Sequence, residues 1–333
     1  MGNATDQTGE FTSLDCITAT YGNVLELLGH DPSVLGEDWG YHPANFPDTE
    51  WPVEDLTIHR RPPEDIIRDW YGLETEFHQH RRTADTADYL REKLGRGEPV
   101  IVLVDAFHLP HSSNHRLQHH AHRITVRSLA GGADDGTYAI VDRYRGSLFD
   151  GAIDARDLLS AMASPALAEG RRGDPDWRLR TLGVSAAPTT APRPAYADSV
   201  HRALARNTAP SAAASATTAL RTCAARLRAT PQEYASLSPA GLIEVSAWFG
   251  ELASQRALNA RFLHTAADAC ALPSLTAHAA TAQALSHHWE KARNYFYLRF
   301  RKGVPAVLRL SDFLDEAANR EAEWNASVRR SLK

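Results

Sequence analysis

A proline-rich segment, Ser185 to Pro194, divides the 333-residue chain into two parts with different patterns. Closely spaced prolines interrupt helices and sheets, so such a segment is typical of a flexible connection between domains. Before it, short apolar runs alternate with turn residues, whereas nearly everything after it has helical spacing. We therefore predict one domain over residues 1–184 and a second, all-helical domain over residues 195–333.

The first part combines helical segments with strand-like runs. Apolar residues recur at helical spacing from Cys16 to Gly29, and residues 83–94 have the same character. Strand-like runs follow at 99–104, 123–129 and 137–141. A glycine-containing turn joins the last two runs, which predicts an antiparallel hairpin. Helices followed by an antiparallel sheet indicate an α+β fold rather than alternating βαβ units.

The second part reads as a series of helices that prolines and a glycine separate. A helix over 157–163 precedes the connection, and the predicted helices beyond it cover 197–206, 211–228, 239–270, 273–301 and 310–330. Prolines and glycines stand between these segments, as expected at helix ends. Long amphipathic helices of this kind are compatible with a homodimer.

Charge and cysteine content restrict the class of protein. The formal net charge is -5, which gives no reason to expect a nucleic-acid partner. No apolar run is long enough to cross a bilayer, so we expect no membrane partner. The N-terminus lacks the features of a signal peptide. Three scattered cysteines are too few for a disulfide framework and indicate a reducing compartment. We expect a cytoplasmic protein that has free thiols.

Cys16 is the first candidate for chemistry. It stands at the predicted start of a helix, where Ser13 or Asp15 can act as the N-cap. A thiol at that position faces unpaired backbone N–H groups and the positive end of the helix dipole, and both favour the nucleophilic thiolate. A small buried residue at a helix start is the alternative interpretation, and for an isolated cysteine it is the more common one.

His122 and Asp142 are candidates for the base and the acid that orients it. His122 opens the predicted strand 123–129, and Asp142 closes the predicted strand 137–141. If these strands pair as a hairpin, the start of one lies beside the end of the other. A carboxylate beside the imidazole holds one tautomer and stabilises its charged form. Cysteine, histidine and acid then complete a nucleophile, base and orienting group.

Four short motifs resemble the butirosin-biosynthesis protein H family, whose N-terminal domain is papain-like. They are Asp-Cys16 before a helix that ends in Leu-Leu-Gly-His30, Asp105-Ala-Phe-His-Leu-Pro110, His119-His-Ala-His122 before an apolar strand, and Val-Asp142-Arg-Tyr. The second histidine of the third motif opens the strand. The resemblance therefore assigns the catalytic histidine to His122 and the acid to Asp142, with Cys16 as nucleophile. Arg256 to Leu263 and Trp289 resemble the helical domain of the same family.

The resemblance implies an acyltransferase of natural-product biosynthesis. Cys16 would take an acyl group from a thioester on an acyl or peptidyl carrier protein, and His122 would deprotonate an incoming amine on a small-molecule acceptor. No cofactor is implied on this chain, because the donor's phosphopantetheine belongs to the carrier protein. The Cys16 backbone N–H is the expected oxyanion donor.

The sequence leaves other interpretations open. His115 and His119, or His119 and His122, have spacings that suit zinc ligands, so metal analysis of the purified protein would test a metal site. Hydrolysis by a peptidase or amidase, and cyclisation that releases a carrier-bound chain, would share the same acyl-enzyme. A non-catalytic binding module would retain a thiol of ordinary reactivity.

A basic cluster in the helical part has two interpretations. It consists of Arg293, Arg299, Arg301 and Lys302. It could receive an acidic carrier protein or the phosphate of its phosphopantetheine arm, although a solvated basic face is the more common meaning of such a cluster. Cys223 and Cys270 lie in predicted helices among alanines and are interpreted as structural.

Overall fold

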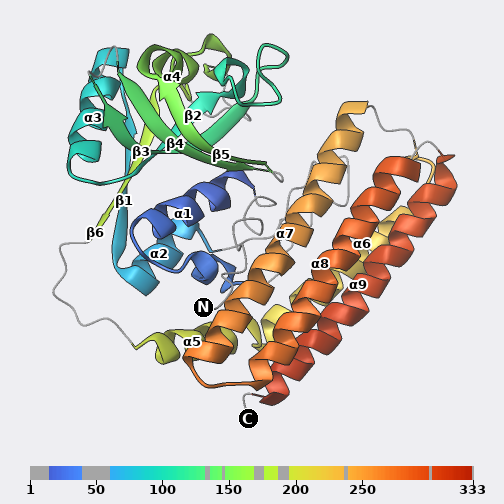
Figure 1. Ribbon diagram of the computed structural model, residues 1–333. Coiled ribbons are helices and arrows are strands. Elements are labelled where there is room, and N and C mark those ends of the chain that lie inside the picture. Colours follow the sequence, from blue (N-terminus) through green and yellow to red (C-terminus); the bar gives the residue numbers. More distant parts are fainter. Residues whose placement is uncertain are drawn as a thin grey trace, which may run out of the picture. The chain divides into compact units, whose positions relative to one another are not determined.

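The computed structural model describes residues 15–39, 61–131, 136–144, 147–168, 176–186, 195–235, 239–299 and 302–331. The chain forms two compact units (Figure 1). Unit 1 comprises Met1–Pro32 and Pro63–Ala191, and unit 2 comprises Ser33–Pro62 and Pro192–Lys333. Part of the predicted first domain thus clusters with the helical unit.

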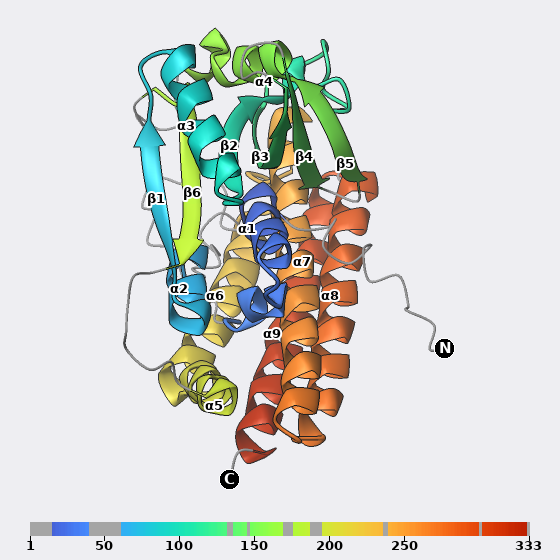
Figure 2. The same cartoon turned by 60° about the vertical axis from the view of Figure 1, so that its left-hand side comes forward.

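Unit 1 contains a six-stranded sheet in the order β1-β6-β2-β3-β4-β5, and every neighbouring pair is antiparallel. The strands are β1 (Leu73–Gln79), β2 (Val100–Asp105), β3 (Ala121–Ala130), β4 (Thr137–Tyr144), β5 (Ser147–Asp154) and β6 (Arg180–Ala186). The predicted hairpin is β3 and β4, with Thr125 opposite Val141. Figure 2 shows β1 and β6 side by side at one edge of the sheet. The α+β class with an antiparallel sheet is confirmed.

Helices cover the two faces of this sheet. They are α1 (Cys16–Leu27), α2 (Pro63–Tyr71), α3 (Thr83–Gly95) and α4 (Ala155–Met162). Alternate side chains of a strand point to opposite faces. Ile124 and Val126 pack with Leu90 of α3 and Leu158 of α4, whereas the Thr125 hydroxyl donates to the Thr20 carbonyl of α1 over 3.4 Å. Helix α1 therefore lies on the face opposite α3 and α4.

Strands β1, β5 and β6 and helix α2 of unit 1 were not predicted. Strand β1 exposes most of its side chains, since only Leu73 among its residues is buried, so it lacks a clean alternation. Strands β5 and β6 each contain a glycine, Gly151 and Gly183, which is uncommon inside strands. Strand β6 also extends beyond residue 184, the predicted end of the first domain.

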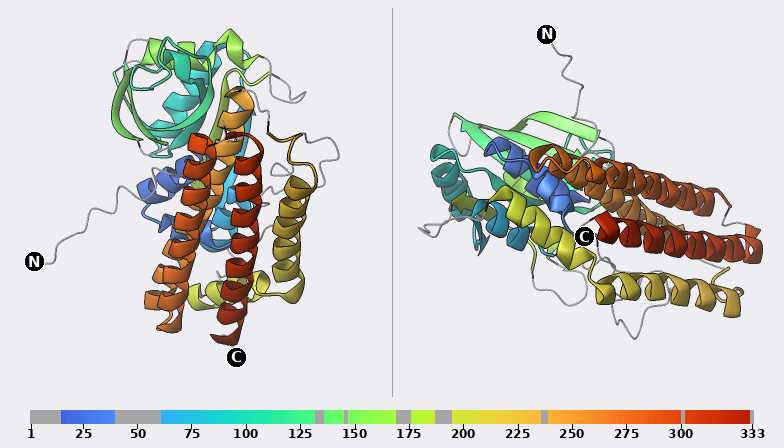
Figure 3. Two further views of the ribbon diagram at one scale, coloured as in Figure 1. Left: turned by 90° about the vertical axis from the view of Figure 1, so that its right-hand side faces the viewer. Right: turned by 90° about the horizontal axis from the view of Figure 1, so that it is seen from below.

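Unit 2 is built from five helices within its described residues, after the short 3-10 turn at Pro32–Gly36. They are α5 (Tyr196–Asn207), α6 (Pro210–Ala229), α7 (Pro239–Ala269), α8 (Ser274–Arg299) and α9 (Val304–Ser331). Figure 3 shows that α6 to α9 run alongside one another. Their core includes Phe249, Trp289 and Phe296, all fully buried. The last helix begins six residues before the predicted start at 310, because a proline such as Pro305 is tolerated in a first helical turn.

Residues 33–39, here called the strap, cluster with unit 2 through backbone contacts. The strap's carbonyls accept hydrogen bonds from side chains of α7: Gln255 and Asn259 donate to the Asp38 carbonyl at 2.7 and 3.0 Å. A Cβ atom added at Gly36 would stand 2.2 Å from the Leu258 carbonyl oxygen, so only glycine allows this approach. Since these contacts are non-local, the sequence pattern contains no sign of them.

Within the described residues, the helices are too short or too polar to cross a bilayer.

Candidate active site

Cys16 occupies the first position of α1. The Asp15 carboxylate caps this helix: its Oδ1 accepts from the Thr18 backbone N–H and its Oδ2 from the Thr18 hydroxyl, both at 2.8 Å. Of the two predicted N-cap residues, Asp15 is the N-cap in the structure, and Ser13 lies outside the described residues. The Cys16 thiol is partly exposed. The cap fixes the direction of the helix tip, and with it the position of the thiol.

His122 and Asp142 meet across β3 and β4. In the observed register Thr125 faces Val141, so Asp142 is the diagonal neighbour of His122. The His122 Nε2 lies 2.8 Å from Asp142 Oδ1, and both residues are buried. A carboxylate only accepts hydrogen bonds, so Nε2 carries the proton of this bond.

The third member of the site is Cys16. Its side chain contributes to the raised pKa of His122, so the thiol lies near this imidazole. The structure therefore brings all three predicted residues together in one part of unit 1. An ion pair of 2.5 Å between Arg143 on β4 and Glu26 on α1 further holds the helix against the strand that carries Asp142.

The buried environment and the hydrogen bonds shift two pKa values in opposite directions. Burial alone would lower the pKa of His122, but the hydrogen bond to Asp142 and the electrostatic effect of the nearby Asp142 and Cys16 side chains outweigh it and raise this pKa to about 9. Burial alone would raise the pKa of Asp142, but hydrogen bonds from His111 and His122 lower it to about 2. The imidazolium–carboxylate pair is therefore the stable form at neutral pH.

These shifts predict how stability depends on pH. Because the pKa of His122 is raised, its protonation stabilises the fold fully at pH values below the ordinary pKa of 6.5, and this stabilisation is lost as the pH rises through about 9. Because the pKa of Asp142 is lowered, its ionisation stabilises the fold at pH values above the ordinary pKa of 3.8, and this stabilisation is lost as the pH falls through about 2. We expect the free energy of unfolding to fall between pH 6 and 9.5 more in the native protein than in a His122→Gln variant. Urea unfolding at both pH values measures this difference, and equal losses would contradict it.

A second buried carboxylate, Asp105, ends β2 and organises the loop that leads to His122. Its Oδ1 accepts from the backbone N–H groups of Phe107 and His120, both at 3.1 Å. Its Oδ2 accepts from the Ser164 hydroxyl at 2.7 Å and from His119 Nδ1 at 2.6 Å. Burial opposes ionisation, yet these hydrogen bonds outweigh it and hold the pKa of Asp105 below its ordinary value. Asp105 and His119 of the family motifs thus have a structural position beside His122.

His111 is a contact of the site that the sequence did not single out. Its Nε2 lies 2.9 Å from Asp142 Oδ2, so one carboxylate receives two imidazoles. In the sequence it is one of several histidines that precede His122. Its position directly after Leu109 and Pro110 is the signal that could have singled it out, since Leu109 is fully buried and anchors this part of the loop.

The predicted zinc alternative concerns His115, His119 and His122. His119 and His122 are directed at different carboxylates, Asp105 and Asp142. Among the residues that the structure describes, no group of three or more His, Cys, Asp or Glu side chains is arranged to hold a metal ion.

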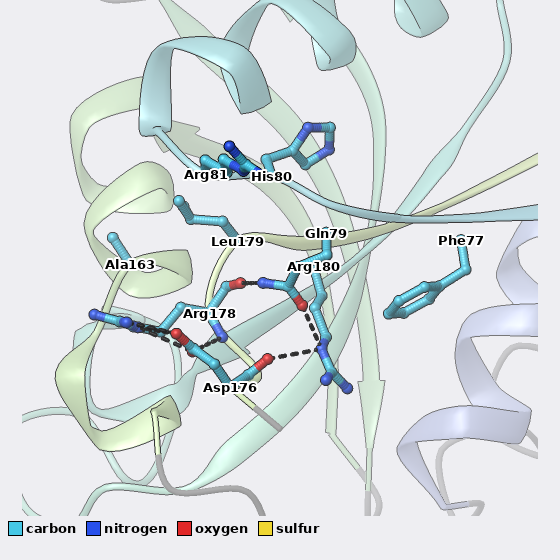
Figure 4. A pocket seen from close by; sticks show the side chains of 9 residues that line it. All are labelled: Phe77, Gln79, His80, Arg81, Ala163, Asp176, Arg178, Leu179 and Arg180. Atoms are coloured by element: carbon cyan, nitrogen blue, oxygen red, sulfur yellow. Dashed lines mark hydrogen bonds and ion pairs between the residues drawn. The ribbon is translucent and has the colours of Figure 1, made fainter. Parts of the chain in front are cut away.

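A cavity of about 590 Å³ lies at the β1–β6 edge of unit 1 (Figure 4). Two of its three arginines are engaged within its own wall. Arg178 pairs with Asp176, and Arg180 Nε donates to Gln79 Oε1 at 2.8 Å while its guanidinium lies over the Phe77 ring. The described wall includes neither Cys16 nor His122 nor Asp142. This cavity is therefore distinct from the candidate site.

The basic cluster of the helical unit is described in part. Arg293 and Lys302 are exposed, while the side chains of Arg299 and Arg301 lie outside the described residues. Cys223 is buried in the core of unit 2, and Cys270 is partly exposed at its surface.

The fold and the site can be compared with known classes of protein. An α+β domain that sets a helix-tip thiol against an imidazole–carboxylate pair has the residue set of enzymes with an activated cysteine nucleophile. The family model described as butirosin biosynthesis protein H, N-terminal, matches residues 15–143, so this part of the chain is similar to that family. The match covers Cys16, His122 and Asp142 and less than half of the chain. No curated protein matches the chain significantly.

Proposed function

We propose that this protein is a biosynthetic acyltransferase that uses Cys16 as its nucleophile. It takes an acyl group from a carrier-protein thioester and passes it to an amine, forming an amide. The observation that carries the proposal is the grouping of Cys16, His122 and Asp142: the His122 imidazole is hydrogen-bonded to Asp142 at 2.8 Å and lies near the Cys16 side chain, which contributes to its raised pKa. The family name connects residues 15–143 with the biosynthesis of an antibiotic, which supports an enzyme of natural-product biosynthesis.

In the first half-reaction the Cys16 sulfur attacks the thioester carbonyl carbon. The bond between that carbon and the phosphopantetheine sulfur breaks, and His122 supplies the proton that the departing thiol needs. One thioester replaces another, so donor and acyl-enzyme have similar energies. Asp142 stabilises the imidazolium from which the proton comes.

In the second half-reaction an amine of the acceptor attacks the acyl-enzyme. The carbon–sulfur bond to Cys16 breaks, the amide bond forms, and His122 takes the proton from the amine nitrogen. The backbone N–H of Cys16 is in the first helical turn, where amides have no intrahelical partner, and it is our candidate for binding the oxyanion. No cofactor on this chain takes part in the proposed steps. We place the reaction in the cytoplasm, where the thiol stays reduced.

The proposal is tested by intact-protein mass spectrometry with an acylated carrier protein, or with an N-acetylcysteamine thioester that mimics the end of its arm. We expect one acyl adduct, which peptide mapping assigns to Cys16. A Cys16→Ala variant should form none. A Cys270→Ala variant, which removes the other partly exposed thiol, should react like the native protein.

The fate of the adduct distinguishes transfer from its alternatives. Decay that depends on an added amine and yields an amide supports acyl transfer. Decay to the free acid in buffer indicates a hydrolase, and release of a ring indicates a cyclase. A native protein that forms no adduct, and whose Cys16 reacts with iodoacetamide no faster than Cys270, would contradict the proposal.

A further inference from the structure

Asp142 is fixed by contacts to both of its oxygens. Oδ1 receives His122 Nε2 and Oδ2 receives His111 Nε2, at 2.8 and 2.9 Å. Phe149 of β5 stands opposite Asp142 in the sheet register, and its ring stacks on the His111 ring at 4.0 Å with an angle of 8°. The His111 side chain is only 11% exposed. The His111 imidazole is thus fixed by two contacts: its face stacks on Phe149, and its Nε2 contacts Asp142.

A closed loop delivers His111 to this position. Residues 106–120 leave and rejoin the sheet at one place, where the Ala106 N–H donates to the His120 carbonyl over 2.9 Å. Compact loops whose ends meet are called Ω-loops and often carry functional side chains. Asp105 binds both ends of this loop, and Leu109 anchors its middle in the core. The loop therefore has a defined path to Asp142.

We propose that His111 is a positioning residue, which acts through Asp142 on the orientation of His122. This inference rests on the proposed roles of Cys16 and His122. A carboxylate bound at one oxygen can rotate about its Cβ–Cγ bond. A second donor at the other oxygen prevents that rotation and keeps Oδ1 directed at His122. Without His111, Oδ2 of a residue that is 7% exposed loses a hydrogen bond, and the carboxylate turns to recover one.

The test uses alkylation of Cys16 by iodoacetamide, which needs no knowledge of the substrate. The full-length His111→Phe variant retains a ring against Phe149 but has no donor, and we expect its Cys16 to react about tenfold more slowly at pH 7. His111→Asn, whose amide is too short to reach Asp142, should be similarly slow. His111→Gln places an amide nitrogen near the position of Nε2 and should restore the rate to within about threefold of native.

A matched control and a pH profile complete the test. His115→Gln alters a histidine of the same loop and should leave the rate unchanged. The inference is overturned if folded His111→Phe and His111→Asn variants keep the native rate and pH profile, or if His111→Gln is as slow as His111→Asn. It is also overturned if the pKa of His122, followed by NMR, rises in His111→Phe while the alkylation rate is unchanged. His111 would then only weaken the electrostatic effect of Asp142 on His122, without orienting the imidazole. An unreactive Cys16 in the native protein would instead contradict the proposed function itself.

Discussion

Exchange of Cys16 for alanine is expected to lower kcat/KM for acyl transfer by about 10⁴-fold or more. Alanine keeps the helix tip and its Asp15 cap, but it has no atom that can form the acyl-enzyme, so the two-step path is lost. Residual activity would come only from binding the donor and the oxyanion. The measurement is amide formation from an acylated carrier protein, or from its thioester mimic, with purified variants of equal thermal stability.

The cooperation of Cys16 with His122 can be examined with a double variant. His122→Gln alone should also be severely impaired, since nothing else in the series can take the proton of the amine. The double variant Cys16→Ala/His122→Gln should be no slower than Cys16→Ala, because residues that act as one unit have strongly non-additive effects. Additive losses would show that the two side chains act independently. Cys270→Ala is the control for loss of a thiol and should be unchanged.

The parts of unit 1 that the sequence predicted are those governed by local patterns. Helix α1 has apolar residues at helical spacing and its own cap, and β3 and β4 are joined by a turn. The hairpin alone was enough to place His122 near Asp142, because antiparallel pairing brings the start of one strand beside the end of the next. Placing Cys16 beside them required the family resemblance, since α1 and β3 are about a hundred residues apart in the chain.

The parts that the sequence did not predict depend on contacts between distant segments. Strand β6 enters the sheet between β1 and β2, although it follows β5 in the chain. Its identity as a strand comes from these two neighbours and not from a strong alternation of its own. His111 is a similar case: its contact with Asp142 depends on the path of a loop that Asp105 fixes at both ends.

Arg256, which belongs to the segment that resembles the family's helical domain, has a physical role in unit 2. The side chain is 1% exposed, and its Nε lies 2.7 Å from Oε1 of the fully buried Glu321. Its Nη1 donates to Asn259 at 2.7 Å, and its Nη2 donates to the Trp39 carbonyl of the strap at 3.1 Å. The guanidinium also lies over the Trp324 ring, 5.3 Å from its centre. One side chain thus connects α7, α9 and the strap.

Arg256→Met is expected to lower the free energy of unfolding of unit 2 by about 3–5 kcal/mol. Methionine fills much of the volume but leaves the Glu321 carboxylate buried without the guanidinium, and removing one partner of a buried pair is costly for that reason. Urea unfolding followed by tryptophan fluorescence reports this change, since Trp39 and Trp324 flank the site.

Two further variants separate the buried charge from the loss of packing. Arg256→Met/Glu321→Leu removes both charges and should be more stable than Arg256→Met alone, because no carboxylate then remains buried without its cation. Arg320→Met removes an arginine that forms an exposed pair with Glu316 on α9 and should cost less than about 1 kcal/mol. If Arg256→Met cost no more than Arg320→Met, the strap would be held by its backbone contacts with Gln255 and Asn259, and the buried ion pair would be incidental to the stability of unit 2.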